Sequence, residues 1–469
     1  MSVDLGVAGQ WARAVFGQAR LGDLRRQRRL LCVVARAAER PGGRISAVFR
    51  KSAERQGAYD LLVNNAVRAQ AIVDAMGDAT LREAATESFV FVAVDGTSLR
   101  VVDRAGRKGM GPLTASRQAA CGVKIISALA VRADGTPIGV TDLRWWVRTR
   151  KRKTRVQDRR QPKDKELGRW IEALETTVAR CAVHAPRTRC WFQLDREADA
   201  WPLLVSLADN GHLFTVRSNH NRVLADGARL ADVLGGARSM GRYELEVSGG
   251  PGRTARVATM QITCARVTLD MKDARIGEHH AVVTNVVRVR EASAVPAGEK
   301  PIEWTLLTNA QIKTFEQARL VVHGYTQRWR IEEFHRAWKS GVCNIEETQL
   351  RGVEPVMKWA AILAAVAVRA EKLKQLARTT PDLPASVELS RDEVHALIRL
   401  KRLNKKRTEE IPATMPTIGQ AVVWLAELGG YTGKSSGGPP GATTIGRGLQ
   451  YVAVGVDMLE ALRIERKMR

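Results

Sequence analysis

The sequence predicts an α/β protein with an antiparallel β region inserted near its centre and helical domains at both ends. Residues 89–103 and 190–194 are short, apolar and rich in β-branched or aromatic side chains, as buried strands are. Residues 212–310 alternate apolar and polar side chains between Gly and Pro turns, which indicates an antiparallel sheet. Residues 1–70 and 354–378 carry apolar side chains at helical spacing. This order of patterns places a sheet between two helical regions.

The net charge of the chain indicates which kinds of partner it binds. Its 469 residues are enough for two to four domains, and 75 Lys and Arg against 49 Asp and Glu give a net charge of +26. Such an excess favours nucleic acid or an anionic membrane surface. No apolar run approaches the roughly 18 residues that cross a bilayer, and the N-terminus lacks a secretion-signal pattern. The six cysteines form no CxxC pair, which argues against a zinc site and favours a reducing cytoplasm. We therefore expect a cytoplasmic protein that binds nucleic acid.

A basic helix near the N-terminus is the first candidate DNA-binding element. It follows Gly22-Asp23, carries apolar side chains at helical spacing and ends at Pro41-Gly42-Gly43. The opposite side of this helix carries four arginines: Arg25, Arg26, Arg28 and Arg29. A second helical stretch follows at 54–66. Two short helices with a basic face suit docking on DNA, and a solvated helix face is the alternative.

Two aspartates stand where strand-like segments end. Asp95 follows the apolar run 89–94 and precedes Gly96, which predicts a break in the strand, and Asp195 directly follows 190–194. Strand ends on a central sheet are where α/β folds place reactive groups. From spacing alone, helix caps or turn residues explain both aspartates as well.

The remaining segments are predicted from local patterns. Residues 124–140 form a hairpin and 167–182 a helix. The segment 148–165 is almost entirely charged, so we expect a surface loop, with non-specific phosphate contact as a second possibility. Gly433-Lys434-Ser435 resembles the end of a phosphate-binding loop, but Leu428 stands where the first glycine is required. A flexible loop is therefore expected there.

The segment 325–339 places a carboxylate between cations. On one helix, four side chains fall within roughly 60° of one another: Tyr325, Arg328, Glu332 and Lys339. An adjoining apolar stripe can pack into a core: Leu320, Ile331, Phe334 and Trp338. Such a face suits an acid held beside a polyanion. Together with the two aspartates, Glu332 completes three hard oxygen ligands, which suit Mg²⁺ or Mn²⁺.

Several motifs together resemble the DDE transposases of bacterial insertion sequences, in particular their Tn-five-like branch (insertion-sequence family four). That branch is marked by the pattern Y-x2-R-x3-E-x6-K, which the segment 325–339 matches at every position. Further similar segments extend over nearly the whole chain: GAYDLLVNN at 57–65, VDGTS around Asp95, LDREAD at 194–199, FTVRSNHNR at 214–222 and PIEWTLLTN at 301–309.

The resemblance implies a domain organisation. Residues 1–70 form a helical domain that binds the transposon ends, and 71–370 form a ribonuclease H-like catalytic domain with its β insertion at about 212–310. Residues 371–469 form a helical dimerisation domain. The implied partners are double-stranded DNA, as terminal inverted repeats and target, and a second copy of the chain in the synaptic complex. The implied location is the bacterial cytoplasm, at the nucleoid.

The resemblance also assigns roles to residues. Asp95, Asp195 and Glu332 become a metal-binding catalytic triad for Mg²⁺, which Mn²⁺ can replace. The implied DNA contacts are Tyr325, Arg328, Lys339, Trp304, Arg217, Arg222 and the four arginines of the N-terminal helix. Trp304 corresponds to an aromatic side chain that stacks on a flipped base, with packing on the sheet as the alternative. The implied activity is cut-and-paste transposition by nicking, hairpin formation and strand transfer.

Three features depart from the family pattern, and three other functions remain as alternatives. Gly-Thr-Ser follows Asp95, residue 219 is Asn where a basic side chain is expected, and 148–165 is unusually basic. These departures affect end specificity and DNA affinity, not the triad. A regulator that binds without cutting is disfavoured by the three carboxylates. A nuclease without strand transfer has no need for Trp304, and a glycosidase does not fit the charge of +26.

Overall fold

The structure is a computed structural model that describes residues 6–103, 106–114, 120–148, 166–250, 252–273, 277–405, 411, 415–433 and 438–468. Residues 149–165 of the predicted basic loop lie outside the described residues, as does Lys434. None of the described helices combines the length and the apolar character needed to cross a membrane.

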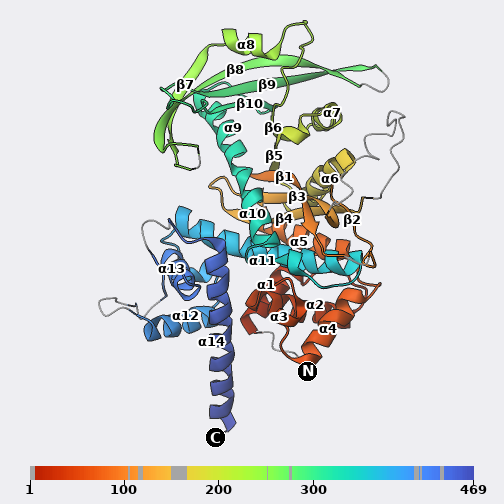
Figure 1. Cartoon of the computed structure of the whole chain (residues 1–469), viewed down its shortest axis with the longest axis vertical. Helices are drawn as coiled ribbons and strands as arrows, with labels where there is room; N and C mark the ends of the chain where they lie inside the picture. The colour runs from red at the N-terminus through yellow and green to blue at the C-terminus, as the bar shows by residue number, and fades with distance from the viewer. Residues whose placement is uncertain are drawn as a thin grey trace.

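The described N-terminal part is helical, as the sequence predicts (Figure 1). Its helices are α1 (Gly6–Phe16), α2 (Leu24–Glu39), α3 (Ile45–Val48), α4 (Ser52–Val63) and α5 (Ala69–Ala84). Helix α2 begins where the side chain of Asp23 accepts a hydrogen bond from the Arg25 N–H group, a typical N-cap. The apolar face of α2 is buried and its arginine-rich face points outward, so this amphipathic prediction is confirmed.

The strands form one continuous mixed sheet. They are β1 (Phe89–Arg100), β2 (Gly111–Pro112), β3 (Cys121–Val131), β4 (Pro137–Trp146), β5 (Arg189–Leu194), β6 (Leu213–Arg217), β7 (Ser239–Val247), β8 (Arg256–Lys272), β9 (His279–Glu291) and β10 (Glu303–Thr308). Their order is β2-β3-β1-β5-β6-β10-β9-β8-β7, with β4 on β3. Strand β6 runs parallel to β5 and antiparallel to β10, so the inserted β region extends the core sheet.

Strand β1 corrects the predicted break at Asp95. It continues to Arg100 because β3 pairs with it from Phe91 to Arg100, including Asp95 opposite Ser127. Only the parallel pairing with β5 ends, at Val94 opposite Leu194. Asp95 therefore lies inside β1, at the level where the parallel neighbour β5 ends.

Helices cover both faces of the core sheet. One face packs on α6 (Glu166–His184), α7 (Trp201–Asp209) and α8 (Leu230–Gly236), and the other on the N-terminal helices and α9 (Phe315–Gln327) to α11 (Val353–Thr379). The C-terminal part has its own small core, formed with the end of α11 by α12 (Arg391–Leu403), α13 (Ile418–Leu428) and α14 (Ala442–Met468). Short 3-10 turns lie at Arg196–Ala198, Ile345–Glu347 and Ala385–Val387. Figure 1 shows β7–β10 at one end of the molecule and α12–α14 at the other.

The predicted single helix over 325–339 is in fact two helices. Helix α9 ends at Gln327 and α10 (Trp329–Lys339) begins after Arg328. Around this residue the hydrogen bonds tighten from the α-helical to the 3-10 pattern: Arg328 N–H donates to Tyr325 O, and Ile331 N–H to Arg328 O, both at 3.1 Å. Arg328 thus lies at a local change of helix geometry.

Candidate active site

Asp95 and Asp195 lie at the same level of neighbouring parallel strands. Val94 and Leu194 are partners in the β1–β5 register, so the two aspartates that follow them are adjacent. The carboxylate of Asp195 also accepts a hydrogen bond from the Glu197 N–H group at 2.8 Å, which fixes the turn after β5. Two residues 100 positions apart in sequence are therefore brought together by sheet register.

This neighbourhood disfavours a charged Asp95. Burial raises the pKa of Asp95 from its ordinary 3.8 to about 7, and the nearby charges of Asp195 and, more weakly, Glu332 add to the rise. The Arg328 guanidinium and the Gly96 N–H group, which donates to Asp95 at 2.7 Å, oppose it. A further cation near Asp95 would therefore favour its ionised form.

Arg328 joins the third carboxylate to the first. Its guanidinium donates to Asp95 Oδ2 at 3.2 Å and to Glu332 Oε1 at 2.6 Å. The Arg328 and Asp95 side chains are 12% and 16% exposed, and that of Glu332 is 32% exposed. Oxygens from β1 and from α10 therefore converge on one positively charged group.

Helix α10 is held against the sheet by apolar packing and one buried hydrogen bond. Ile331, Phe334 and Trp338 are fully buried, as the predicted stripe requires. His335 Nε2 lies 3.1 Å from the hydroxyl oxygen of Ser127, the register partner of Asp95. Burial, with the charges of nearby cations, lowers the pKa of His335 to about 3, so this imidazole is neutral.

Lys339 lies at the end of α10, near the strand that carries Asp95. Its ammonium nitrogen is 3.4 Å from the Thr97 hydroxyl oxygen and 3.9 Å from a Glu346 carboxylate oxygen. Thr97 lies two residues after Asp95, so both side chains point to the same face of β1. The predicted Tyr325–Lys339 group therefore borders the aspartates.

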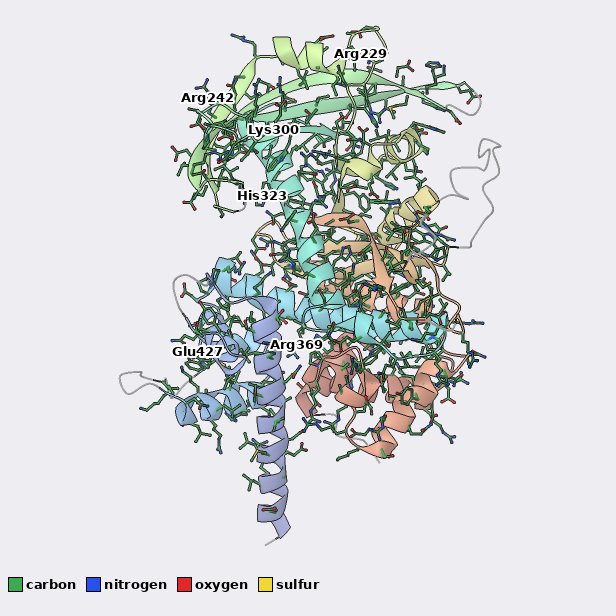
Figure 2. The ribbon with its side chains drawn as sticks, viewed as in Figure 1. Arg229, Arg242, Lys300, His323, Arg369 and Glu427 are labelled. Atoms are coloured by element: carbon green, nitrogen blue, oxygen red, sulfur yellow. The ribbon has the colours of Figure 1, made fainter. Side chains whose placement is uncertain are left out.

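Tyr325 and Trp304 meet where the β insertion joins the core. Their rings make an edge contact with centroids 6.0 Å apart, and Tyr325 is buried. Arg217 is the register partner of Leu306 on β10, so it lies on the same face of the sheet as Trp304. Helix α9 also contacts the turn between β3 and β4, where His323 Nε2 lies 2.6 Å from the Ala133 carbonyl oxygen, and Figure 2 shows His323 along this helix.

The structure places Arg222 in an internal ion pair. Its Nε donates to Asp199 Oδ1 at 2.8 Å, and one of its terminal nitrogens donates to the Asp199 carbonyl oxygen at 2.7 Å. The Asp199 side chain is fully buried. Arg222 therefore organises the turn after β5, and its DNA contact stays a prediction.

The arginines of α2 differ in their surroundings. Arg25, Arg28 and Arg29 are exposed, whereas Arg26 is partly buried and donates to the Leu21 carbonyl oxygen at 3.1 Å. At the other end of α2, basic side chains meet the C-terminal helix: Arg36 and Arg40 lie 3.9 and 3.5 Å from Asp457 of α14.

Trp329 is an exposed aromatic residue near the site that the sequence motifs did not single out. This residue opens α10 directly after Arg328, and its side chain is 53% exposed. A large exposed aromatic side chain of this kind can stack on a base. Its position outside the apolar stripe of Ile331, Phe334 and Trp338 was the available signal.

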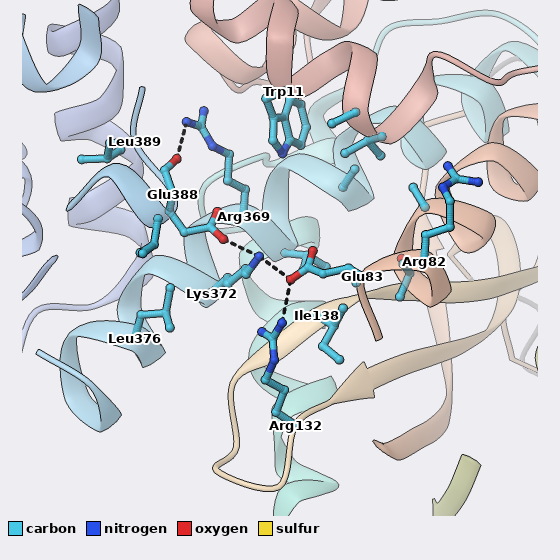
Figure 3. A pocket seen from close by; sticks show the side chains of 18 of the residues that line it. Trp11, Arg82, Glu83, Arg132, Ile138, Arg369, Lys372, Leu376, Glu388 and Leu389 are labelled. Carbon is cyan, nitrogen blue, oxygen red and sulfur yellow. Dashed lines mark hydrogen bonds and ion pairs between the residues drawn. The ribbon is translucent and has the colours of Figure 1, made fainter. Parts of the chain in front are cut away.

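A cavity of about 850 Å³ lies elsewhere, where α1, α5, the β3–β4 turn and α11 meet. Its cations are paired within the chain: Lys372 and Arg132 lie 2.7 and 3.1 Å from Glu83, and Lys372 also contacts Glu388 (Figure 3). The three carboxylates of the candidate site do not line it.

The carboxylates are the candidate metal ligands. In the conformation of the described residues, no three Asp, Glu, His or Cys side chains are arranged to hold a metal ion. The donor set nonetheless fits a hard divalent cation, because oxygens of Asp95 and Glu332 already point at one cation, Arg328. Asp195 is adjacent through the strand register.

Three families of known proteins match the chain in succession. Transposase DNA-binding matches residues 8–67, the Transposase DDE domain matches 131–369, and the Transposase Tn5 dimerisation domain matches 365–467. The DDE match includes Asp195 and Glu332 and begins after Asp95. These matches give the core a ribonuclease H-like fold and support DNA binding, dimer formation and a nuclease or transposase activity. Because the DDE match alone covers more than half of the 469 residues, the chain belongs to the Tn5-like DDE transposases.

Proposed function

We propose that this transposase moves its own insertion sequence by a cut-and-paste route, using Asp95, Asp195 and Glu332 as one catalytic centre. Two adjacent pairs of carboxylates carry the proposal: Asp95 with Asp195, and Asp95 with Glu332. The β1–β5 register sets the aspartates side by side, and Arg328 links Asp95 to Glu332. Such a cluster suits successive displacements at phosphorus.

The proposed cofactor is Mg²⁺, with Mn²⁺ as a substitute, held by the three carboxylates. Hard carboxylate oxygens are the ligands that these ions prefer. When bound, the metal would help to activate the attacking oxygen and to stabilise the leaving one. Burial raises the pKa of Asp95, and the charges of Asp195 and Glu332 add to the rise, so a bound divalent cation would stabilise its ionised form, which supports the proposal.

The surrounding side chains would position the DNA end. Tyr325, Arg328 and Lys339 border the carboxylates and are suited to bind backbone phosphates. Trp304 would stack on a flipped base, a contact worth about 1–3 kcal/mol. Water would first cleave one strand at the end of the element. The freed 3′-hydroxyl would then attack the other strand to give a hairpin, which is reopened and joined to target DNA.

The proposed domains keep the boundaries that the sequence predicts. Residues 1–70 would bind the terminal inverted repeats through the exposed arginines of α2, and 71–370 would carry the chemistry. Residues 371–469 would pair two copies, and the boundary at 370 falls inside α11.

Helix α14 offers a surface for this pairing. An exposed apolar stripe follows one side of it: Tyr451, Val454, Met458 and Leu462. The spacing of 3, 4 and 4 residues puts these side chains on one helix face. Met458→Glu should place an uncompensated charge in the dimer interface and reduce paired-end complexes at least tenfold in analytical ultracentrifugation. Unchanged pairing would remove α14 from the proposed interface.

The test of the catalytic centre is Glu332→Gln on a DNA fragment that carries the terminal repeat. We expect no Mg²⁺-dependent nick and no hairpin on a denaturing gel, with end binding retained. The matched control is Glu316→Gln, the same change at an exposed position on α9. Retained cleavage in Glu332→Gln would contradict the assignment. Binding without any cutting by the unmodified chain would indicate a regulator.

A further inference from the structure

We infer that Arg328 is an internal counter-cation for the catalytic carboxylates, which DNA phosphate and a divalent metal displace together. In the free protein Arg328 neutralises Asp95 and Glu332. When a strand phosphate takes the guanidinium, the carboxylate oxygens become available to the metal. The inference rests on the proposed function and adds a regulation of the same site.

The first support is the exclusiveness of the contact. Within the described part of the chain, Arg328 is the one basic residue with an ion pair to either Asp95 or Glu332. Lys339 points instead to Thr97 and Glu346. The guanidinium thus uses Asp95 Oδ2 and Glu332 Oε1, oxygens that a divalent cation bound by these residues would need.

The second support is charge. One guanidinium supplies a single positive charge to a cluster of three carboxylates, so a divalent cation is the stronger counter-ion. A guanidinium and a metal ion bound to the same carboxylate oxygens would repel each other strongly in a partly buried site. A bound metal would therefore expel the Arg328 side chain from its present position.

The third support is that Arg328 is suited to bind a phosphate in place of the carboxylates. It lies at the junction of α9 and α10, and its guanidinium carbon is 5.9 Å from the centroid of the Tyr325 ring. A planar guanidinium binds phosphate through two parallel hydrogen bonds, as it binds a carboxylate. A phosphate near Tyr325 could therefore exchange for the carboxylates.

Exchange through one side chain makes the two binding events reciprocal. Phosphate that removes Arg328 from the carboxylates should strengthen metal binding, and metal should strengthen phosphate binding by the same factor. The protein without DNA would then bind metal weakly, which protects other DNA from cleavage.

The experiment measures Mn²⁺ binding to the full chain by electron paramagnetic resonance of the free ion. Binding is measured with and without a DNA duplex that ends at the terminal repeat. This duplex lacks the phosphodiester bond that the first cut would break. We expect this DNA to tighten Mn²⁺ binding by roughly 5-fold to 150-fold, the usual range of coupling. In Arg328→Gln, Mn²⁺ should bind more tightly without DNA, and the DNA should add little.

Two further variants keep the test decisive. Arg328→Lys retains the positive charge and should keep the weak Mn²⁺ binding of the unmodified chain without DNA, even if Arg328→Gln folds poorly. Arg336→Gln is the matched control, because Arg336 is exposed on the same helix and has no ion pair with the carboxylates in the described residues. It should retain the full effect of DNA.

The outcomes separate this inference from the proposed function. Equal Mn²⁺ affinity of the unmodified chain and Arg328→Gln without DNA, together with loss of Mn²⁺ binding in Glu332→Gln, would overturn the counter-cation and keep the catalytic centre. Unchanged Mn²⁺ binding in Glu332→Gln would overturn both.

Discussion

Asp95 and Asp199 each contact an arginine, and the charges of the two contacts balance differently. Asp199 has a fully buried side chain that binds Arg222. The same carboxylate accepts hydrogen bonds from the Asn219 N–H group at 2.6 Å and from the Ser218 hydroxyl at 3.3 Å. One carboxylate thus meets one guanidinium and two neutral donors, which compensates both its charge and its lone pairs.

The Asp95 cluster has the opposite balance. Arg328 is shared between Asp95 and Glu332, and Asp195 adds a third carboxylate. Burial raises the pKa of Asp95, and the charges of Asp195 and Glu332 add to the rise. Burial beside an arginine therefore does not by itself indicate function. The number of carboxylates per cation distinguishes the two contacts. At Asp199 one carboxylate meets one guanidinium, whereas the Asp95 cluster can accept a further cation.

The largest expected effect separates the two aspartates of the LDREAD segment. Asp199→Ala should lower the free energy of unfolding by roughly 3–5 kcal/mol, because it leaves the Arg222 charge without its partner. Asp195→Ala should cost no more than about 2 kcal/mol, the loss of a cap, and should abolish DNA cleavage. Urea unfolding of the full chain, monitored by circular dichroism, measures the loss of stability in both variants. Equal losses of stability would contradict the distinction.

The second expected effect is a pH dependence caused by Asp95. Its pKa rises from 3.8 in the ordinary state to about 7 in the folded protein. Between these values the folded state keeps a proton that the unfolded state has lost, so stability falls as pH rises through this window. Each pKa unit is worth about 1.4 kcal/mol, so the full effect is of the order of a few kcal/mol.

The variant Asp95→Asn lacks this titration. Its stability relative to the unmodified chain should therefore increase from pH 4 to pH 7 when both are measured in EDTA. A difference that does not change with pH would show that Arg328 already compensates Asp95 fully.

The smallest expected effect concerns DNA binding by the two nearby arginines. Arg217→Gln should weaken binding of end DNA and reduce the slope of log affinity against log salt by about 1, because one phosphate contact is lost. Arg222→Gln should leave this slope unchanged and lower stability, since its partner is Asp199. Fluorescence anisotropy over a salt series measures the slope. An equal change of slope in Arg222→Gln would return that residue to the DNA surface.

Local patterns in the sequence were enough for many of the elements and for the chemical class of the site. Helical spacing predicted the buried face of α2 and the stripe of Ile331, Phe334 and Trp338, because neighbours at i+3 and i+4 share a face whatever the rest of the chain does. Strand patterns predicted β5 and the antiparallel insertion. The carboxylates and basic residues of the site were identifiable by type and motif.

The tertiary structure decided which of these residues meet. The sequence pattern suggested that β1 breaks at Asp95, yet pairing with β3 carries it to Arg100. The resemblance suggested Arg222 as a DNA contact, and the structure adds that this residue pairs with the buried carboxylate of Asp199. Periodicity describes only neighbours a few positions apart, whereas partners such as Asp95 and Arg328 are 233 residues apart. Their contact depends on strand register and helix packing, which are set by burial over the whole core and not by any local pattern.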